Sequence, residues 1–318
     1  MDRACHMTHV AVPVPDPLAP GKALGDRELV LERQEARRHL EAIGAADNGL
    51  YSGLYSAEPG RSRALWPAAG LFYEPMEFQG PRAHEKGRAA FNAGIQWLLH
   101  GALHVGDRLR LSARISDRWL KRGREYAVIE MTARNQAGKL VAVGCFKESW
   151  DRPPEYLPPL PSLDGQKSSW RVEPKGIEVN RFDCRYTDAM SRLFAGPIRN
   201  LHTELDMARQ RGFDRLVIAG PQIVAQMSEL MTRTFGLDYL ASGEIKVNLL
   251  KPVFSGDTVS ARAAFIDSDG ESAGGERTDP VQVAIWAVNQ HAETVAAGVG
   301  QARIRRDSSG RPDEPQRS

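Results

Sequence analysis

The sequence predicts an α+β protein made of two similar halves, in each of which an antiparallel sheet wraps around a central helix. Three observations support this prediction. The chain contains an internal repeat at a nearly fixed offset, its repeated segments are short alternating runs joined by Gly-Asp turns, and a long apolar helix precedes the second set of runs. The length of 318 residues agrees with two domains.

The repeat is clearest around two Gly-Asp turns. Residues 95–107 (IQWLLHGALHVGD) and 245–257 (IKVNLLKPVFSGD) share Ile, Leu, Gly and Asp at a constant offset of 150. Further on, residues 135–144 align with 289–298 at an offset of 154, and the four extra residues fit in the polar loop 267–279. A single Gly-Asp turn is common, but an ordered series of matches indicates duplication.

The second half shows the helix and the strands most plainly. Residues 221–235 (PQIVAQMSELMTRTF) place apolar side chains at spacings of three and four, with Pro221 in the first turn and Gly236 at the expected stop. Four strands are expected after it, at 244–253, 258–266, 281–288 and 294–304. A helix followed by such a sheet predicts a hotdog layout, and hence a double hotdog for the whole chain.

The first half is less regular before its strands. Residues 27–42 are predicted to be helical, and residues 62–71 are predicted to form a shortened central helix. The Pro-rich stretch between the halves reads as an extended linker. The expected organisation is an irregular segment 1–24, a first hotdog domain 25–150, a linker 151–180, a second hotdog domain 181–306 and a disordered tail 307–318.

Composition limits the classes of function. The 42 basic and 40 acidic residues nearly balance, so neither nucleic acid nor a membrane is an expected partner. No run approaches the roughly 18 apolar residues that span a bilayer. Cys5, Cys145 and Cys184 are widely spaced and are expected to be free thiols. A cytoplasmic location is therefore expected, with a mitochondrial one left open.

Three segments of the second half carry a family resemblance: 192–202 (RLFAGPIRNLH), 213–220 (FDRLVIAG) and 249–257 (LLKPVFSGD). On these segments the region 181–306 resembles the MaoC-like dehydratases, a family that includes the R-specific enoyl-CoA hydratases. Residues 25–150 resemble the partner half, which lacks the catalytic loop, in the double-hotdog members of that family.

The resemblance implies roles for individual residues. Gly196 and His202 stand at the family spacing of the catalytic loop, and His202 is implied to be the base, which suits a group that titrates near neutral pH. The thioester carbonyl is implied to bind backbone N–H groups where the central helix begins, at Gly220 first and at Gln222 second.

The catalytic loop also departs from the family pattern. The family aspartate falls at Pro197, which cannot exchange a proton, and the family asparagine falls at Arg199. Asn200 lies one place later and is a candidate to supply the lost amide. Arg199 remains protonated, so it is a candidate to polarise the carbonyl or to bind an acidic substrate group.

The sequence therefore supports a hydratase or dehydratase of acyl-CoA or acyl-carrier-protein thioesters. The alternative is a degenerate acyl-thioester-binding or assembly subunit, which Pro197 favours. A hotdog thioesterase is less favoured, because Glu229 is the only acid of the central helix and falls off its apolar stripe. No glycine-rich phosphate loop and no metal-ligand spacing is found, so no cofactor beyond the carrier thioester and no metal is expected. The chain is expected to be a monomer or a homodimer.

Overall fold

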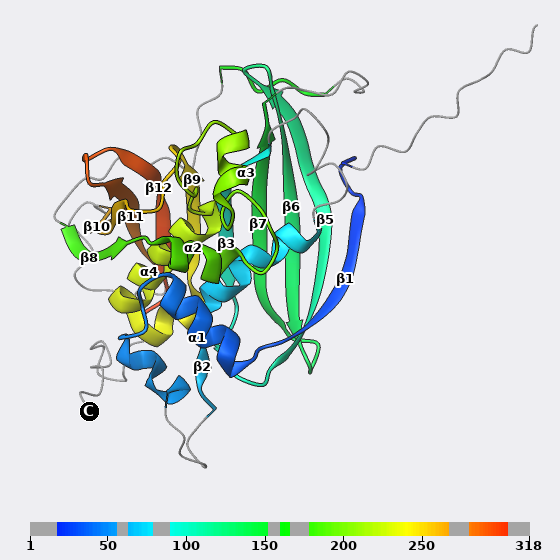
Figure 1. Ribbon diagram of the computed structural model, residues 1–318. Helices are drawn as coiled ribbons and strands as arrows, with labels where there is room; N and C mark the ends of the chain where they lie inside the picture. The colour runs from blue at the N-terminus through cyan, green and yellow to red at the C-terminus, as the bar shows by residue number, and fades with distance from the viewer. Residues whose placement is uncertain are drawn as a thin grey trace, which may run out of the picture.

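The computed structural model describes residues 18–55, 63–78, 90–151, 160–165, 178–266 and 280–304. Within these residues the chain forms the predicted double hotdog: one ten-stranded sheet curves around a set of helices (Figure 1). The strand order is β1-β5-β6-β7-β3-β9-β12-β11-β10-β8, and neighbouring strands pair antiparallel.

Each half contributes five strands to this sheet. Those of the first half are β1 (Ala23–Val30), β3 (Ala90–Leu99), β5 (Arg108–Lys121), β6 (Arg124–Asn135) and β7 (Leu140–Trp150). Those of the second half are β8 (Glu178–Arg185), β9 (Glu244–Leu249), β10 (Thr258–Phe265), β11 (Val281–Asn289) and β12 (Thr294–Ala302). The four strands predicted after the central helix are confirmed. A fifth strand in each half, β1 or β8, covers the outer edge.

The central helix of the second half is α4 (Gly220–Ser242). Every residue from Pro221 to Thr232 is buried, so the sheet and the first half surround this part of the helix on all sides. Gly236 has φ 55° and ψ −133°, which interrupts the helix at the predicted stop before further turns follow.

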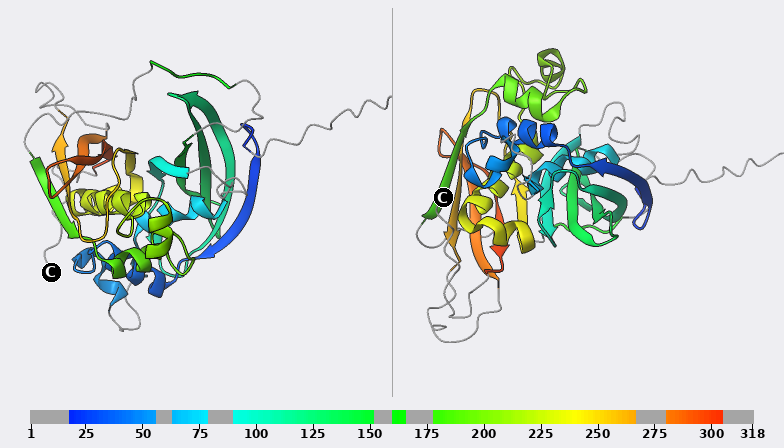
Figure 2. Two further views of the ribbon diagram at one scale, coloured as in Figure 1. Left: turned by 45° about the horizontal axis from the view of Figure 1, so that its top comes forward. Right: turned by 90° about the horizontal axis from the view of Figure 1, so that it is seen from below.

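The counterpart of α4 in the first half is shorter. It is the 3-10 helix η2 (Ala68–Phe78), which lies further along the chain than predicted. Phe72 of η2 stacks on Trp97 of β3, with 5.2 Å between ring centroids. The other helices are α1 (Arg33–Ala42), η1 (Gly49–Leu54), α2 (Asp188–Ala195) and α3 (Leu205–Gln210), and β2 (Leu65–Trp66) pairs with β4 (Leu103–His104). The helices lie between the two curved ends of the sheet, with α1 beside α2 (Figure 2).

The two halves meet where β3 pairs with β9, and the register shows the duplication directly. Gln96 lies opposite Lys246, and their numbers differ by 150, the offset of the sequence repeat. On either side, Ile95 faces Val247 and Trp97 faces Ile245. A pseudo-two-fold axis therefore passes between Gln96 and Lys246.

The repeated Gly-Asp turns also match in their hydrogen bonds. In each half the aspartate accepts from an arginine, from the backbone N–H three residues before it and from a glutamine in the turn that precedes the last strand of that half, β7 or β12. The donors to Asp107 are Arg63 (2.6 Å), His104 (2.9 Å) and Gln136 (3.3 Å), and those to Asp257 are Arg215 (2.8 Å), Phe254 (3.0 Å) and Gln290 (3.0 Å). The turn chemistry read from the repeat is thus preserved in both copies.

The prediction of a helix over residues 27–42 is wrong in its first part. Ala23–Val30 forms β1, and the helix begins only at Arg33. The cause is the pairing of β1 with β5. Without this pairing the backbone of β5 would form an open edge of the sheet. Arg27 and Leu29 lie on the half-buried side of this strand, so an alternating pattern was read as a helical one.

The expected connections are described in part. β8 begins at Glu178, inside the predicted linker, and Ser162 of that linker forms a parallel bridge to Leu120 of β5. Residues 1–17, the polar loop 267–279 and the predicted tail lie outside the described residues. Cys145 and Cys184 are free thiols. No helix within the described ranges is long and apolar enough to cross a bilayer.

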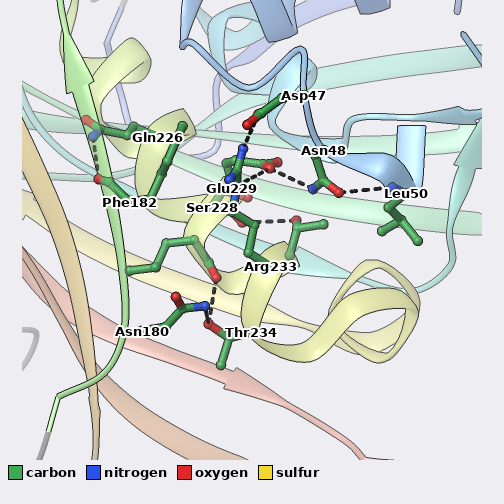
Figure 3. A network of polar contacts seen from close by, with 12 residues as sticks. Asp47, Asn48, Leu50, Asn180, Phe182, Gln226, Ser228, Glu229, Arg233 and Thr234 are labelled. Carbon is green, nitrogen blue, oxygen red and sulfur yellow. Dashed lines mark hydrogen bonds and ion pairs between the residues drawn. The ribbon is translucent and has the colours of Figure 1, made fainter. Parts of the chain in front are cut away.

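A polar network around the buried carboxyl of Glu229 ties the first half to α4 (Figure 3). Glu229 of α4 accepts from Asn48 Nδ2 at 2.7 Å and from Arg233 Nε at 2.9 Å. Arg233 also pairs with Asp47 at 2.7 Å. Asn48 Oδ1 in turn accepts from the backbone N–H of Leu50 and caps η1. Burial of Glu229 raises the pKa of its carboxyl to about 7.

Replacing Asn48→Ala is expected to lower the free energy of unfolding by about 1–3 kcal/mol, because it removes a donor to a buried carboxyl and a helix cap. Asp47→Ala is the matched control, since Asp47 is exposed and a surface ion pair contributes at most about 1 kcal/mol. Urea unfolding measures both changes. Equal losses of unfolding free energy in the two variants would contradict a stronger contribution from the Asn48–Glu229 hydrogen bond.

The stability is also expected to fall as the pH rises from about 4.5 toward 8. Burial raises the pKa of Glu148 to about 8, whereas an unfolded glutamate titrates near about 4.3. The folded state therefore holds the proton more tightly than the unfolded state, and the stability this provides is lost as the carboxyl ionises. In urea titrations Glu148→Gln should weaken this dependence, while Glu28→Gln, at an exposed position, should not.

Candidate active site

The segment between α2 and α3 holds most of the predicted site residues. Gly196 ends α2, and a Cβ added to it would lie 2.6 Å from the Arg192 carbonyl oxygen, so this position needs glycine. The Ser191 hydroxyl donates to the His202 carbonyl at 2.7 Å and fastens the segment to α2. The predicted catalytic loop is thus held against the helix that precedes it.

The side-chain amide of Asn200 forms hydrogen bonds to the backbone of this loop through both its nitrogen and its oxygen. Its Nδ2 donates to the carbonyls of Ala195 (3.2 Å) and Ile198 (3.1 Å), and its Oδ1 accepts from the His202 N–H at 2.8 Å. Both amide hydrogens are engaged by backbone. In this geometry Asn200 orients His202 and has no free donor for a substrate.

The His202 ring is fixed by a single strong contact. Its Nδ1 lies 2.7 Å from the Val217 carbonyl oxygen. A carbonyl oxygen only accepts, so Nδ1 carries the hydrogen and Nε2 presents a lone pair in the neutral ring. Burial lowers the pKa of His202, although the bond to Val217 opposes this. The structure therefore holds His202 as a neutral imidazole with Nε2 available as a proton acceptor.

The start of α4 lies three residues after this contact. In the described part of the chain no acceptor bonds the Gly220 N–H, which leaves it as a donor at the positive end of the helix. A Cβ at Gly220 would collide with Leu249 Cδ1 and lie 3.3 Å from the Asn92 Cβ. Glycine is thus required here by the close approach of β9 and β3.

Gln222 has a different position from the one expected. It is fully buried, and its Nε2 donates to the carbonyls of Ala42 (2.8 Å) and Met190 (3.3 Å). Its backbone N–H bonds to Ala219 O at 2.9 Å. Gln222 therefore joins the ends of α1 and α2 to α4, and its donors point to protein.

Arg199 lies on the surface. Its side chain is 70% exposed and faces two acids of the following segment, Asp206 at 3.5 Å and Glu204 at 4.0 Å. The structure thus binds His202 to the carbonyl of Val217, three residues before Gly220. It uses Asn200 to orient His202 and leaves Arg199 exposed.

A pocket of about 510 Å³ lies where the two halves meet. Residues 193–198 form one wall and β1, α1, Trp66 and η2 form the other, so Gly196 is the one predicted site residue in its lining. Pro197 also lines it. Across from Pro197 the wall carries charge: Arg27 pairs with Glu74 at 3.1 Å. His39 of the same wall is neutral, because burial lowers its pKa to about 3.

The resemblance implies that the first half helps to shape the acyl channel, but its individual residues in this region were not predicted. His39, Trp66 and Tyr73 line the pocket, and Asn92 touches the start of α4. None of them belongs to a recognisable motif. The one available signal was the offset of 150, which marks β3 and β9 as equivalent strands of the two halves. The structure pairs these two strands and so places β3 near the start of α4. Among the described residues no group of His, Cys, Asp and Glu could hold a metal ion.

Solved structures that resemble this chain include two described as MaoC-like dehydratases and one described as having a double hotdog fold. A MaoC-like dehydratase from Phytophthora capsici has a TM-score of 0.69 at 14% identity, over 92% of this chain and 100% of that one. Another MaoC-like dehydratase has a TM-score of 0.67 at 13% identity, over 92% and 99% of the two chains. The full-length peroxisomal multifunctional enzyme type 2 from Drosophila melanogaster has a TM-score of 0.64 at 14% identity, over 87% of this chain and 48% of that one.

No family model matches the chain, and no curated protein matches it in sequence. At 13–14% identity the structural likeness establishes the fold. The resemblance to MaoC-like dehydratases that residues 192–202 indicated is confirmed at that level. The roles of individual residues stay predictions.

The state of His202 is directly measurable. Because burial lowers its pKa, the ring is expected to titrate below the ordinary value of about 6.5. An NMR titration of the histidine ring signals measures this, with His202→Gln used to assign the resonance. A midpoint at or above about 6.5 would mean that His202 is more exposed, or closer to an anion, than this structure shows.

Proposed function

We propose that this protein is an acyl-thioester hydratase/dehydratase, which adds water to an enoyl-CoA or enoyl-carrier-protein thioester or removes it from the 3-hydroxyacyl product. One observation carries the proposal. The bond from His202 Nδ1 to Val217 O holds a neutral imidazole at a residue three positions before α4, and within the described residues the Gly220 N–H at the start of α4 has no acceptor. A proton acceptor and a carbonyl-binding donor are the two parts that this reaction needs most.

In the hydration direction, the Gly220 N–H and the positive end of α4 polarise the thioester carbonyl and make the β-carbon electrophilic. His202 Nε2 removes a proton from water as the oxygen bonds to that carbon, and electrons move onto the carbonyl oxygen. The resulting enolate takes a proton at the α-carbon. His202 can return the proton that it removed, so one imidazole can serve both steps.

Pro197 bears on the rate of this reaction. Loss of a general acid–base group typically costs ~10²–10⁴ in rate, so a chain with proline at the family aspartate position is expected to be a slow enzyme, or one that relies on His202 and water. The exposed position of Arg199 and its two acidic neighbours give no support to its recruitment as a replacement.

The second candidate is an acyl-thioester-binding or assembly subunit without turnover, which Pro197 favours. A thioesterase has less support. Glu229 is buried, contrary to its expected place off the apolar stripe, but its carboxyl is bound to Asn48 and Arg233. We also propose that the carrier thioester is the only cofactor-like group, that the pocket beside Pro197 receives the acyl part, and that the protein acts as a monomer or homodimer in the cytoplasm.

Purified protein mixed with short, branched and carboxylated enoyl-CoAs is expected to reduce the ultraviolet absorbance of the enoyl thioester. His202→Ala should lower that rate by ~10²–10⁴ without loss of binding. Since His202 acts as a neutral base with a lowered pKa, the wild-type rate should persist to mildly acidic pH and fall below the His202 pKa.

His291→Ala is the matched control, because His291 lies exposed in the turn after β11. It should leave the rate unchanged. Binding of acyl-CoA without turnover on any enoyl or 3-hydroxyacyl thioester, tested with both carriers, would instead identify the binding subunit.

A further inference from the structure

Asn92 of β3 is an unusual residue for a well-packed seam. The nitrogen and the oxygen of its carboxamide are both buried, and neither has a hydrogen-bond partner among the residues that the structure describes. Leaving a buried amide without partners costs about 1–3 kcal/mol for each group. Gln226 of α4 shows the usual solution: its amide donates to the Phe182 and Val259 carbonyls and accepts from the Tyr186 hydroxyl. A buried amide with no partner on either of its polar atoms calls for an explanation, and a ligand that bonds to it is one.

The side chain lies against the start of α4. Measured from the point where a Cβ of Gly220 would be, the Asn92 Cβ is 3.3 Å away and its Cγ is 3.6 Å away. The unbonded Gly220 N–H and the unbonded Asn92 carboxamide are therefore neighbours, although one belongs to the second half and the other to the first.

A β-bulge turns Asn92 toward this point. Ile95 and Trp97 of β3 are buried on the helix side, so regular alternation would aim Asn92 to the opposite face. The register between β3 and β7 shifts between Asn92 and Gly94, which places Asn92 opposite Glu148 on the face of Ile95 and Phe146. Bulges often re-aim a side chain beside an active site.

We propose that Asn92 Nδ2 donates a second hydrogen bond to the thioester carbonyl oxygen beside the Gly220 N–H, so that the first half completes the carbonyl-binding site of the second. The inference rests on the proposed function, because it takes an acyl thioester as the ligand. Two converging donors, one from backbone and one from an amide side chain, are a common way to stabilise a carbonyl oxygen that gains negative charge.

The surroundings suit such a charge. Glu148, the cross-strand neighbour of Asn92, has its pKa raised to about 8 by burial, so it is mostly uncharged at neutral pH and opposes an enolate little. Lys147, next to it in β7, donates to Asn248 at 2.8 Å. Because Pro197 supplies no carboxylate, polarisation of the thioester carbonyl is expected to contribute a larger share of the rate enhancement.

The test measures the carbonyl itself. Butyryl-CoA labelled with ¹³C at the thioester carbonyl is bound to the full-length protein, and isotope-edited infrared spectroscopy records its stretching band. The wild type should shift the band to lower frequency. Asn92→Ala and Asn92→Asp should lose part of that shift, and Asn92→Ala should lower hydration kcat by ~10²–10³-fold, as for loss of one carbonyl-binding donor. Asn180→Ala, whose amide bonds Thr234 at 2.9 Å, is the matched control and should change neither quantity.

Stability gives an independent readout. Because the amide is unsatisfied, Asn92→Ala should melt at the same or a higher temperature than the wild type, whereas loss of a structural residue would lower it. An unchanged band shift in Asn92→Ala, or no bound band in the wild type, would overturn the inference. If the wild type turns over and the band shift is unchanged in Asn92→Ala, the role of Asn92 is refuted and the hydratase proposal is kept. If the band shift depends on Asn92 but no turnover is found, the hydratase proposal is refuted, while the proposed hydrogen bond from Asn92 to the thioester carbonyl is supported.

Discussion

The pairing of β3 with β9 makes one sheet out of two halves, and the rest of the architecture depends on it. At this seam Ile95, Trp97, Ile245 and Val247 are almost wholly buried, so the halves share a core as well as hydrogen bonds. The same pairing brings the first half against the start of α4. A separate first domain would leave that helix start partly uncovered and open to water, which weakens any carbonyl contact there.

Much of the fold could be predicted from the sequence because its signals are local. Alternating runs, Gly-Asp turns and the stop at Gly236 each reflect a backbone preference within a few residues. The first part of the chain lacked such a signal. Residues 23–30 become β1 because β5 needs a partner, and η2 begins only at Ala68 because Leu65 and Trp66 pair with β4. Both outcomes depend on contacts distant in sequence.

The site divides in the same way. The ring of His202 bonds to the carbonyl of Val217, three residues before Gly220, and the roles that the resemblance implies for both residues remain predictions. The positions of three nearby polar side chains could not be predicted from their spacing in the sequence. Asn200 orients the loop, Gln222 joins three helices, and Arg199 faces solvent. The first half's contribution depends on a one-residue bulge, and no motif announces such a feature.

The position of Gln96 opposite Lys246 has a consequence for how the two halves can change. In a dimer of identical chains, a residue on the two-fold axis must face its own copy, so a lysine there would meet a lysine. Joining both halves in one chain removes that constraint, and every substitution then occurs once rather than twice. One half can keep a histidine loop while the other remodels its helix and its pocket wall. Duplication within a chain thus allows an asymmetric binding cavity that a symmetric pair could not build.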